Sequence, residues 1–398
     1  MLLSQLPALP ADPLLGLSIA YRADSNTNKV DLGVGVYKDA IGNTPIMDAV
    51  TKAQSSWAAQ EATKAYAPPA GFEGFNDAML NLLLGESHPA LKEQRAISVQ
   101  APGGCGALRI AAEMLMRCQE SVRVWVSTPT WANHLPLLGS AGLQLIEYPY
   151  YDYKAHKIDF AAMLTSLDKL EAGDLVLLHG CCHNPSGADL SLEQWQALAQ
   201  VLNKKGAVPF VDIAYQGLGE GLDEDAQGLR YLAEHCPEMI IASSCSKNFG
   251  LYRERVGSVA VIANTNAAAQ VCRSQLMNVA REIYSMPPSH GAALVDIILH
   301  NNDLTQSWQN ELATMRERIA ALRSTFAESL TAAGFSSAFD FIENEKGMFS
   351  FLGITAAQVQ QLRDQHSIYM AGSSRINVAG LNDNNMSYVI EALKNVMA

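Results

Sequence analysis

Residues 243–257 read Ser-Ser-Cys-Ser-Lys-Asn-Phe-Gly-Leu-Tyr-Arg-Glu-Arg-Val-Gly, and they follow an apolar run, Met239–Ala242, that is typical of a buried strand. Lys247 is the most informative residue here, because small polar residues surround it and Arg253 and Arg255 follow closely. A lysine crowded beside other cations loses its proton more easily than a free lysine. The neutral amine can attack a carbonyl to form a Schiff base, and the arginines can hold an anion. The segment therefore suggests a cofactor that carries both an aldehyde and a phosphate.

Working outward, the middle of the chain alternates short apolar runs with longer amphipathic runs, which predicts an α/β fold with a mostly parallel sheet wrapped by helices. Buried strands are predicted at Val122–Ser127, Leu175–His179, Val208–Ile213 and Met239–Ser243. Ser191 and Gln194 form a capping box that opens a helix. A long helical pattern runs from about Asp303 to Ala332 and ends at Gly334.

The bulk properties narrow the class of protein. A chain of 398 residues is long enough for two domains. Its net charge of −12 argues against a nucleic acid or an anionic membrane as partner, since both favour basic surfaces. Seven cysteines without regular spacing suit a reducing compartment, and neither a signal peptide nor an apolar run long enough to span a membrane is present. The expected location is the cytoplasm.

The segment from Ser246 to Gly257 strongly resembles the pyridoxal-phosphate (PLP) segment of class I aminotransferases, in particular the aspartate aminotransferases. The resemblance runs through nearly the whole chain, from Asp-Leu-Gly-Val-Gly-Val-Tyr-Lys at 31–38 to Ser-Arg-Ile-Asn-Val-Ala-Gly at 374–380. It implies the PLP fold-type I architecture, a large domain with a mostly parallel central sheet and a smaller α/β domain. The large PLP-binding domain is then expected at residues 46–314, and the N-terminal arm and small domain at residues 1–45 and 315–398.

Asp212 lies in an otherwise apolar strand, and a buried carboxylate needs a partner. From the residues alone, a structural ion pair and a partner for a protonated pyridine nitrogen are equally good explanations. The resemblance implies the second role, with Tyr215 and Asn184 donating hydrogen bonds to the ring oxygen of the cofactor. It also implies that Asn184 contacts the substrate and that Tyr215 acts with Asp212 and Lys247 in catalysis.

Gly103, Gly104 and Cys105 follow a strand-like segment and open a helix, where free backbone N–H groups can bind phosphate. A plain tight turn is an equally good explanation of this segment by itself. With Ser244 and Arg255 as further donors, it becomes a phosphate cup. The family often has a hydroxyl residue where this chain has Cys105, and a thiol is a poorer donor.

The resemblance also selects Trp131, whose flat indole would stack on the pyridine ring and contact the substrate. It suggests that His134 orients Asp212, although a core histidine is the simpler explanation. Thr128-Pro129 and Asn184-Pro185 match positions where the family has cis peptide bonds.

Arg375 matches the arginine that holds the substrate's α-carboxylate, which suits the planar guanidinium. The resemblance implies that Arg281 holds the distal carboxylate in the neighbouring subunit and that Tyr66 reaches the phosphate across the same interface. Two residues donated to another chain imply a homodimer with shared active sites. Gly35 would leave room for the substrate.

Two other motifs could indicate a different chemistry, a metal site or an acylating serine. His179-Gly-Cys-Cys-His183 is spaced too tightly for four tetrahedral ligands, so no metal is expected. Ser244-x-x-Lys247 mimics an acylating serine motif, but the chain has no accompanying Lys-Thr-Gly.

The predicted activity is therefore PLP-dependent transamination of L-aspartate with 2-oxoglutarate, which gives oxaloacetate and L-glutamate by a ping-pong mechanism. The substrates would be amino acids and 2-oxo acids, and Lys247 would move the Cα proton. An aromatic or dual-specificity aminotransferase is the alternative, because Ala65 and Met286 depart from the usual polar residues. A binding protein without turnover, a β-lyase and a decarboxylase on the same fold stay open.

Overall fold

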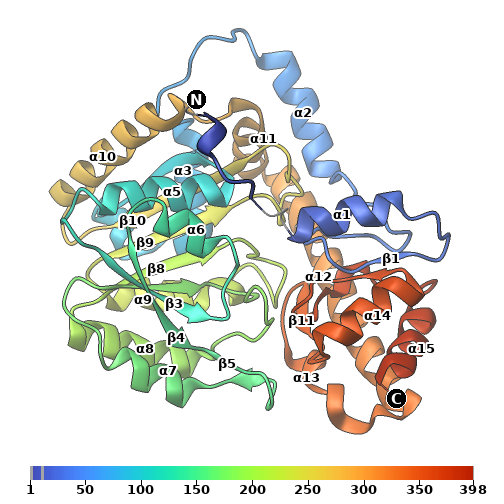
Figure 1. Cartoon of the computed structure of the whole chain (residues 1–398). Coiled ribbons are helices and arrows are strands. Elements are labelled where there is room, and N and C mark those ends of the chain that lie inside the picture. Colours follow the sequence, from blue (N-terminus) through green and yellow to red (C-terminus); the bar gives the residue numbers. More distant parts are fainter. Residues whose placement is uncertain (1–2, 10–12, 398) are drawn as a thin grey trace.

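The centre of the protein is a seven-stranded sheet, shown in the computed structural model of the chain in Figure 1. The structure describes residues 3–9 and 13–397, with the side chains of residues 13–15, 336 and 337 outside that description. The strand order is β2-β10-β9-β8-β7-β3-β4. These strands are β2 (Ala96–Pro102), β3 (Arg123–Thr128), β4 (Gln144–Pro149), β7 (Leu175–His179), β8 (Val208–Ile213), β9 (Met239–Ser244) and β10 (Val256–Ile262).

The sheet is mostly parallel, which confirms the predicted fold class. Strands β4, β3, β7, β8 and β9 run parallel to their neighbours, whereas β10 is antiparallel to both β9 and β2. The predicted strands at 175–179 and 208–213 have the observed bounds. The strand predicted at 122–127 is shifted by one residue at both ends in β3, the strand predicted at 239–243 is one residue longer in β9, and neither β4 nor β10 was predicted.

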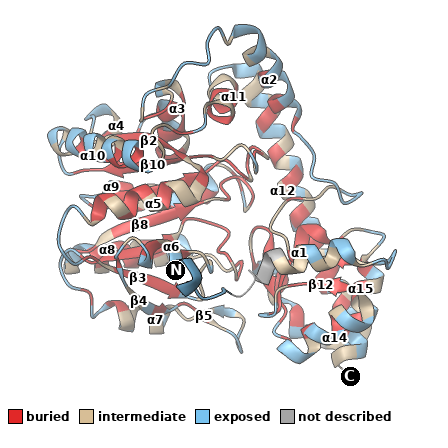
Figure 2. Cartoon of the chain, turned by 45° about the horizontal axis from the view of Figure 1, so that its top comes forward, coloured by how far each residue is buried: buried red, intermediate tan, exposed pale blue. Residues whose placement is uncertain are grey.

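Helices cover both faces of the sheet, so its strands are buried on both sides (Figure 2). The helices are α1 (Pro13–Ala23), α2 (Asp48–Gln60), α3 (Glu73–Leu84), α4 (Pro89–Lys92), α5 (Gly103–Leu115), α6 (His134–Gly139), α7 (Phe160–Leu167), α8 (Leu192–Lys205), α9 (Gln227–His235), α10 (Asn266–Tyr284), α11 (Ser289–Leu299), α12 (Asn302–Leu330), α13 (Phe341–Asn344), α14 (Ala356–His366) and α15 (Met386–Met397). Along β7, Val176 and Leu178 join one hydrophobic core while Leu175 and Leu177 join the other. Successive side chains of a strand point to opposite faces, so an uninterrupted apolar run serves both cores.

Local sequence signals explain where two helices begin and end. The side chain of Ser191 accepts from the backbone N–H of Gln194 at 3.3 Å, and the Gln194 side chain accepts from the Ser191 N–H at 2.9 Å, so the predicted capping box opens α8. Helix α12 ends at Leu330, and a five-residue turn then reaches Gly334, whose φ of +102° favours glycine. The predicted long helix is confirmed to within two residues at each end.

A third hydrophobic core brings the two ends of the chain together. Val30 and Leu32 pack there with residues between Leu322 and Leu393. The short strand β1 (Val30–Asp31) pairs in parallel with β12 (Ile368–Tyr369), and β11 (Phe349–Phe351) pairs with β13 (Arg375–Asn377); the remaining pair is β5 (Tyr151–Asp152) with β6 (Lys157–Ile158). This body lies beside the sheet in Figure 1, with α12 leading into it. The domain boundaries at residues 46 and 314 stay a prediction.

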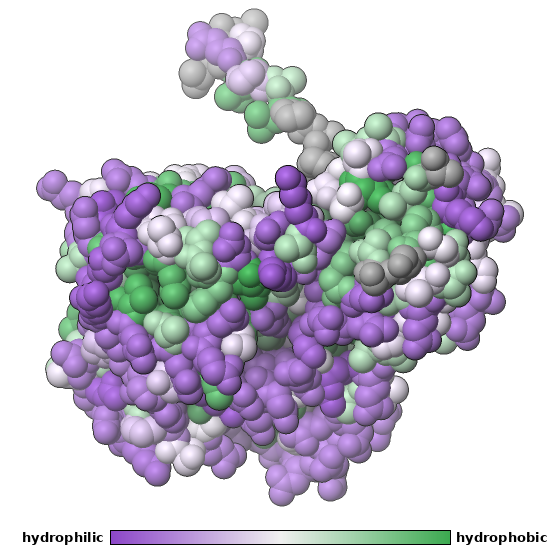
Figure 3. Space-filling model, turned by 90° about the horizontal axis from the view of Figure 1, so that it is seen from below, coloured by the Kyte–Doolittle hydropathy of each residue, from purple (hydrophilic) through white to green (hydrophobic). Residues whose placement is uncertain are grey.

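The N-terminal segment stands clear of the rest of the chain in Figure 3 and carries hydrophobic side chains. Leu3, Leu6 and Leu9 are 78%, 73% and 86% exposed. Within the described part of the chain, no helix combines the length and the apolar character that crossing a membrane requires.

Candidate active site

A cavity of about 220 Å³ opens at the carboxyl ends of β7, β8 and β9, where ligands of such sheets usually bind. Gly35, Phe349 and Arg375 close it from the side of the third core. The cavity therefore lies between two bodies of the fold, and both contribute side chains to its wall.

Lys247 reaches this cavity from the loop between β9 and β10. Its Nζ lies 4.7 Å from the centre of the Tyr215 ring. Burial lowers the pKa of Lys247, and Arg255 lowers it further, while Asp212 and Cys105 oppose the shift. The crowded setting inferred from the sequence thus has its expected effect, and the amine is more readily available in its neutral form.

Asp212, near the carboxyl end of β8, is 8% exposed and lies 3.0 Å through Oδ2 from Nε2 of His134. Burial raises the pKa of Asp212, but the hydrogen bond from His134 and the nearby Lys247 outweigh it, so the net pKa is lowered. The other His134 nitrogen is 2.8 Å from Thr130 Oγ1, which lies 3.0 Å from Nε2 of His179. Burial lowers the pKa of His179 to about 3, so this histidine is neutral. The chain of hydrogen bonds orients His134 and keeps Asp212 ionised.

The start of α5 faces Arg255, Ser244 and Ser246. Gly103 has φ +68°, and a Cβ there would lie 2.5 Å from Nη2 of Arg255. Nη1 of Arg255 donates to the Tyr252 carbonyl at 3.0 Å and to Ser246 Oγ at 3.4 Å. In the described part of the chain, Arg255 has no carboxylate partner. A helix N-terminus and an uncompensated guanidinium together favour an anion such as phosphate.

Arg375, at the start of β13, is 7% exposed and lies 4.3 Å above the Phe349 ring. It donates through Nη2 to the Gly33 carbonyl at 2.8 Å and through Nη1 to Asn184 Oδ1 at 3.3 Å. Its Nε is buried without a hydrogen-bond partner, and no described Asp or Glu pairs with it. A buried charge is normally paired, so this guanidinium is prepared for a carboxylate of a ligand.

Most of the residues predicted for the site line this one cavity. They are Gly35, Gly104, Cys105, Trp131, Asn184, Asp212, Tyr215, Ser244, Lys247, Arg255 and Arg375. Gly103 adjoins it behind Arg255. Both expected cis bonds, Thr128-Pro129 and Asn184-Pro185, are present.

Two predicted residues lie away from the cavity. Tyr66 is 91% exposed. Arg281 is also exposed, near the end of α10, and donates to Ser285 Oγ at 3.0 Å. The cavity of a single chain does not include either side chain, and their predicted roles are not tested by the geometry of one chain.

Five residues that line the cavity were not predicted: His179, Cys181, Ala214, Ser246 and Phe349. Ser246 could have been found, because it directly precedes Lys247. His179 ends a predicted strand and could have been flagged as a polar residue at a carboxyl end. Phe349 carries no local signal, since an apolar residue in a short strand is usually core.

Comparison with known proteins identifies the class. The family model described as "Aminotransferase class I and II" matches residues 27–393. An aspartate aminotransferase of Escherichia coli (strain K12) is 46% identical over 390 residues, which are 98% of both chains. An aromatic-amino-acid aminotransferase of Pseudomonas aeruginosa is 44% identical, also over 98% of both chains.

The solved structures agree. An aromatic-amino-acid aminotransferase of Burkholderia pseudomallei, described as covalently bound to pyridoxal phosphate, has a TM-score of 0.98 with 41% identity and covers 100% of both chains. The chain therefore belongs to the class I and II aminotransferase family, and the resemblance inferred from its sequence is confirmed. It is an aminotransferase.

Proposed function

We propose that this aminotransferase uses pyridoxal phosphate to convert L-aspartate and 2-oxoglutarate into oxaloacetate and L-glutamate by a ping-pong mechanism. The observation that carries the proposal is the meeting, in one cavity, of the amine of Lys247, the carboxylate of Asp212 and the guanidinium of Arg375. These residues come from separate parts of the chain, and the packing of a hydrophobic core does not explain why their polar groups meet.

The described residues fit pyridoxal phosphate. When bound, this cofactor supplies an aldehyde and an electron-withdrawing pyridine ring that make the Cα proton of an amino acid acidic. The start of α5 and Arg255 suit its phosphate, because a helix start binds anions and Arg255 pairs with no carboxylate among the described residues. Asp212 suits a protonated ring nitrogen, since it is buried and held ionised. The residues that would hold the cofactor are Gly103, Gly104, Cys105, Trp131, Asn184, Asp212, Tyr215, Ser244, Lys247 and Arg255, with Tyr66 from a second chain.

The protein's own groups account for the proton movements. Nζ of Lys247 would take the proton from the substrate Cα and deliver it to the aldehyde-derived carbon of the cofactor, with these roles reversed in the second half of the reaction, so one amine would serve as base and then as acid. Its lowered pKa supports this role, because a base must be unprotonated to begin. Tyr215 stays a neutral donor, because burial raises the pKa of its hydroxyl.

Arg375 is the proposed anchor for the α-carboxylate, and Gly35 leaves room beside it. A Cβ at Gly35 would lie 2.8 Å from Cζ of Phe349, the ring that lies under Arg375. Arg281 of a second chain is the proposed anchor for the distal carboxylate, which favours aspartate. Aromatic specificity is the second candidate, because relatives described as aromatic-amino-acid aminotransferases are nearly as similar as those described as aspartate aminotransferases.

The proposed assembly is a homodimer with shared active sites. Tyr66 and Arg281 are both exposed in the single chain, which supports a use outside it. Leu3, Leu6 and Leu9 expose apolar surface on a segment that stands clear of the body, as expected of an arm that packs on a partner. The cytoplasm is the proposed location, because all seven cysteines are free and the chain is acidic.

Hybrid dimers test the shared sites. Before mixing, each of two variants should have little or no activity on aspartate. These variants are Lys247→Ala and Arg281→Leu. If Arg281 serves the partner's site, mixing unfolded chains and refolding them produces heterodimers with one intact site, about a quarter of all sites after random pairing. If Arg281 served its own chain, no heterodimer would have an intact site. Activity on aspartate that does not rise after mixing would rule out the proposed exchange.

A substrate panel tests the activity itself. The enzyme is supplied with one amino acid at a time, and the oxo-acid product is quantified. The second substrate is 2-oxoglutarate for aspartate, tyrosine and phenylalanine, and oxaloacetate for glutamate. The highest kcat/KM is expected with aspartate. A highest value with tyrosine or phenylalanine would select the aromatic alternative, and release of pyruvate or carbon dioxide in place of the matching oxo acid would contradict transamination.

A further inference from the structure

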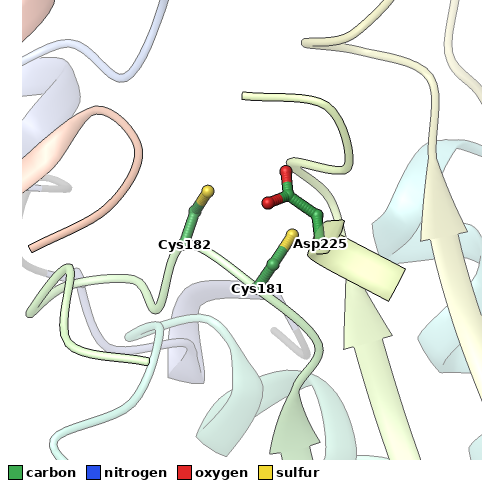
Figure 4. A group of neighbouring side chains, drawn as sticks. All are labelled: Cys181, Cys182 and Asp225. Carbon is green, nitrogen blue, oxygen red and sulfur yellow. The ribbon is translucent and has the colours of Figure 1, made fainter. Parts of the chain in front are cut away.

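Two adjacent cysteines face a buried carboxylate behind the active site. Cys181 and Cys182 lie in the loop after β7, and Asp225 belongs to a short 3-10 helix (Glu224–Ala226). The two Sγ atoms and a carboxylate oxygen all lie within 4.8 Å of one another. Figure 4 shows the three groups turned toward a common space. The tight spacing predicted no metal site made of ligands between residues 179 and 183 alone, and Asp225 lies outside that segment.

The backbone holds the two thiols on the same side of the chain. Successive residues of an extended segment point in opposite directions. Cys182 instead has φ +49°, and its N–H donates to a carboxylate oxygen of Asp189 at 2.6 Å. Gly347 packs directly against it, since a Cβ at Gly347 would lie 2.4 Å from Cβ of Cys182. The side chains are thus preorganised.

Asp225 is fixed in the same way. Its Oδ2 accepts from the N–H groups of Gly217 and Gly219 at 2.8 and 2.9 Å, and its Oδ1 accepts from that of Glu220 at 2.8 Å. In a tetrahedral zinc site with Zn–S bonds of about 2.3 Å, the donor atoms are about 3.5–3.8 Å apart. The limit of 4.8 Å on the observed separations exceeds these values by about 1.0–1.3 Å, so small movements of the side chains would complete the geometry.

The group is buried but can be reached. Cys181 and Asp225 line a cavity of about 330 Å³ whose wall also carries Asp189, Glu220 and Glu224. Its one basic side chain among the described residues, Lys346, is paired with Glu220 at 2.8 Å. A wall with this excess of carboxylates attracts cations and leaves room for a water molecule as a further ligand.

We propose that Cys181, Cys182 and Asp225 bind one thiophilic divalent cation, such as Zn²⁺ or Cd²⁺, with water from the cavity as the fourth ligand. Both cysteine sulfurs lose their protons on binding, and the two protons leave to solvent. Thiolates are soft ligands, and two of them favour a thiophilic cation over cations that prefer oxygen ligands. Mg²⁺ and Ca²⁺ are therefore not expected to compete.

The site has a direct route to the catalytic cavity. Cys181 lines both cavities, and the N–H of the preceding Gly180 donates to the carbonyl of Asp212 at 2.8 Å. Drawing the Cys181 sulfur toward a cation moves part of the active-site wall. Occupancy of the site by the cation is therefore expected to lower kcat for transamination. This effect on kcat rests on the proposed function, but the binding of the cation is independent of it.

The test is a Cd²⁺ titration of the PLP-loaded protein, followed by the ultraviolet charge-transfer band of cadmium thiolates and by calorimetry. One Cd²⁺ per chain is expected, with a band that corresponds to two thiolates. Cys182→Ser should weaken binding at least about tenfold. Asp225→Asn serves as a second variant, and circular dichroism and thermal melting establish that each protein is folded.

Two matched cysteine variants serve as controls. Cys105→Ser removes the thiol in the catalytic cavity, and Cys118→Ser removes the exposed thiol after α5. Both should bind Cd²⁺ with unchanged affinity. The proposal is overturned if wild-type protein binds no Cd²⁺ with two thiolates, if folded Cys182→Ser binds as tightly as wild type, or if either control variant abolishes the band.

Discussion

Replacing Arg375 gives the sharpest test of how the catalytic cavity recognises substrate. A guanidinium has five N–H donors, and the contacts to Gly33 and Asn184 use two of them. Three donors remain, including the buried Nε without a partner. A carboxylate can therefore take a two-toothed pair of bonds without disturbing the existing contacts.

The size of the effect follows from those bonds. Each hydrogen bond to a charged group contributes about 1.5–3 kcal/mol, so losing two costs about 3–6 kcal/mol. Because each 1.36 kcal/mol is a factor of ten, Arg375→Leu should lower kcat/KM for aspartate by about 150- to 25,000-fold. Arg375→Lys keeps the charge but not the planar fork, and losing one bond should cost about 10- to 100-fold.

Steady-state rates of oxaloacetate formation measure both values, with thermal melting as a check on folding. The affinity for pyridoxal phosphate, measured by equilibrium titration of the apoprotein, should change far less than kcat/KM, because Arg375 contacts neither Lys247 nor the start of α5 and its one hydrogen bond to a proposed cofactor residue is the 3.3 Å bond to Asn184. A loss below about tenfold in a folded Arg375→Leu protein would refute the assignment. So would a loss of cofactor affinity as large as the loss of kcat/KM.

The remaining predictions concern three other positions. Lys247→Ala should fold and bind pyridoxal phosphate but lose at least about 100-fold in kcat, the contribution of a positioned acid–base group; kcat within a few fold of wild type would contradict this. Arg281→Leu should lower kcat/KM for aspartate far more than for phenylalanine, and equal losses would remove its role at the distal carboxylate. Gly103→Ala should weaken cofactor binding and lower the melting temperature, because the new Cβ would lie 2.5 Å from Arg255 at φ +68°; unchanged binding and melting would contradict the packing argument.

The sequence predicts the parts of the fold that depend on local chemistry. The apolar runs at 175–179 and 208–213 are buried on both faces of the sheet, and such uninterrupted apolar runs predict strands. The capping box at Ser191 is a local pair of hydrogen bonds, and its pattern is visible in four residues. These signals need no knowledge of distant contacts.

Other features depend on tertiary contacts and could not be predicted. Strand β10 lies antiparallel between β9 and β2, and its paired residues in β2 are 154 to 166 positions away in the sequence (256 − 102 and 262 − 96). The helix that follows β2 includes Gly103 and Gly104 in its first turn, where they pack against Arg255 and Ser244. Glycine is a poor helix former by itself, so only these neighbours explain its place there.

The candidate site shows the same division, with one physical consequence. The sheet brings together the cofactor residues that come from a single chain, because its parallel strands end at a common edge. Arg281 and Tyr66 were selected on the family resemblance alone, and in the single chain both point into solvent. An exposed arginine gains little from a surface ion pair, so by itself it could not discriminate a second carboxylate. The same guanidinium becomes selective only when another surface excludes water from it. If the proposed dimer carries the preference for aspartate over phenylalanine, that preference should vanish when the dimer is dissociated, even where Lys247 and Arg375 are intact.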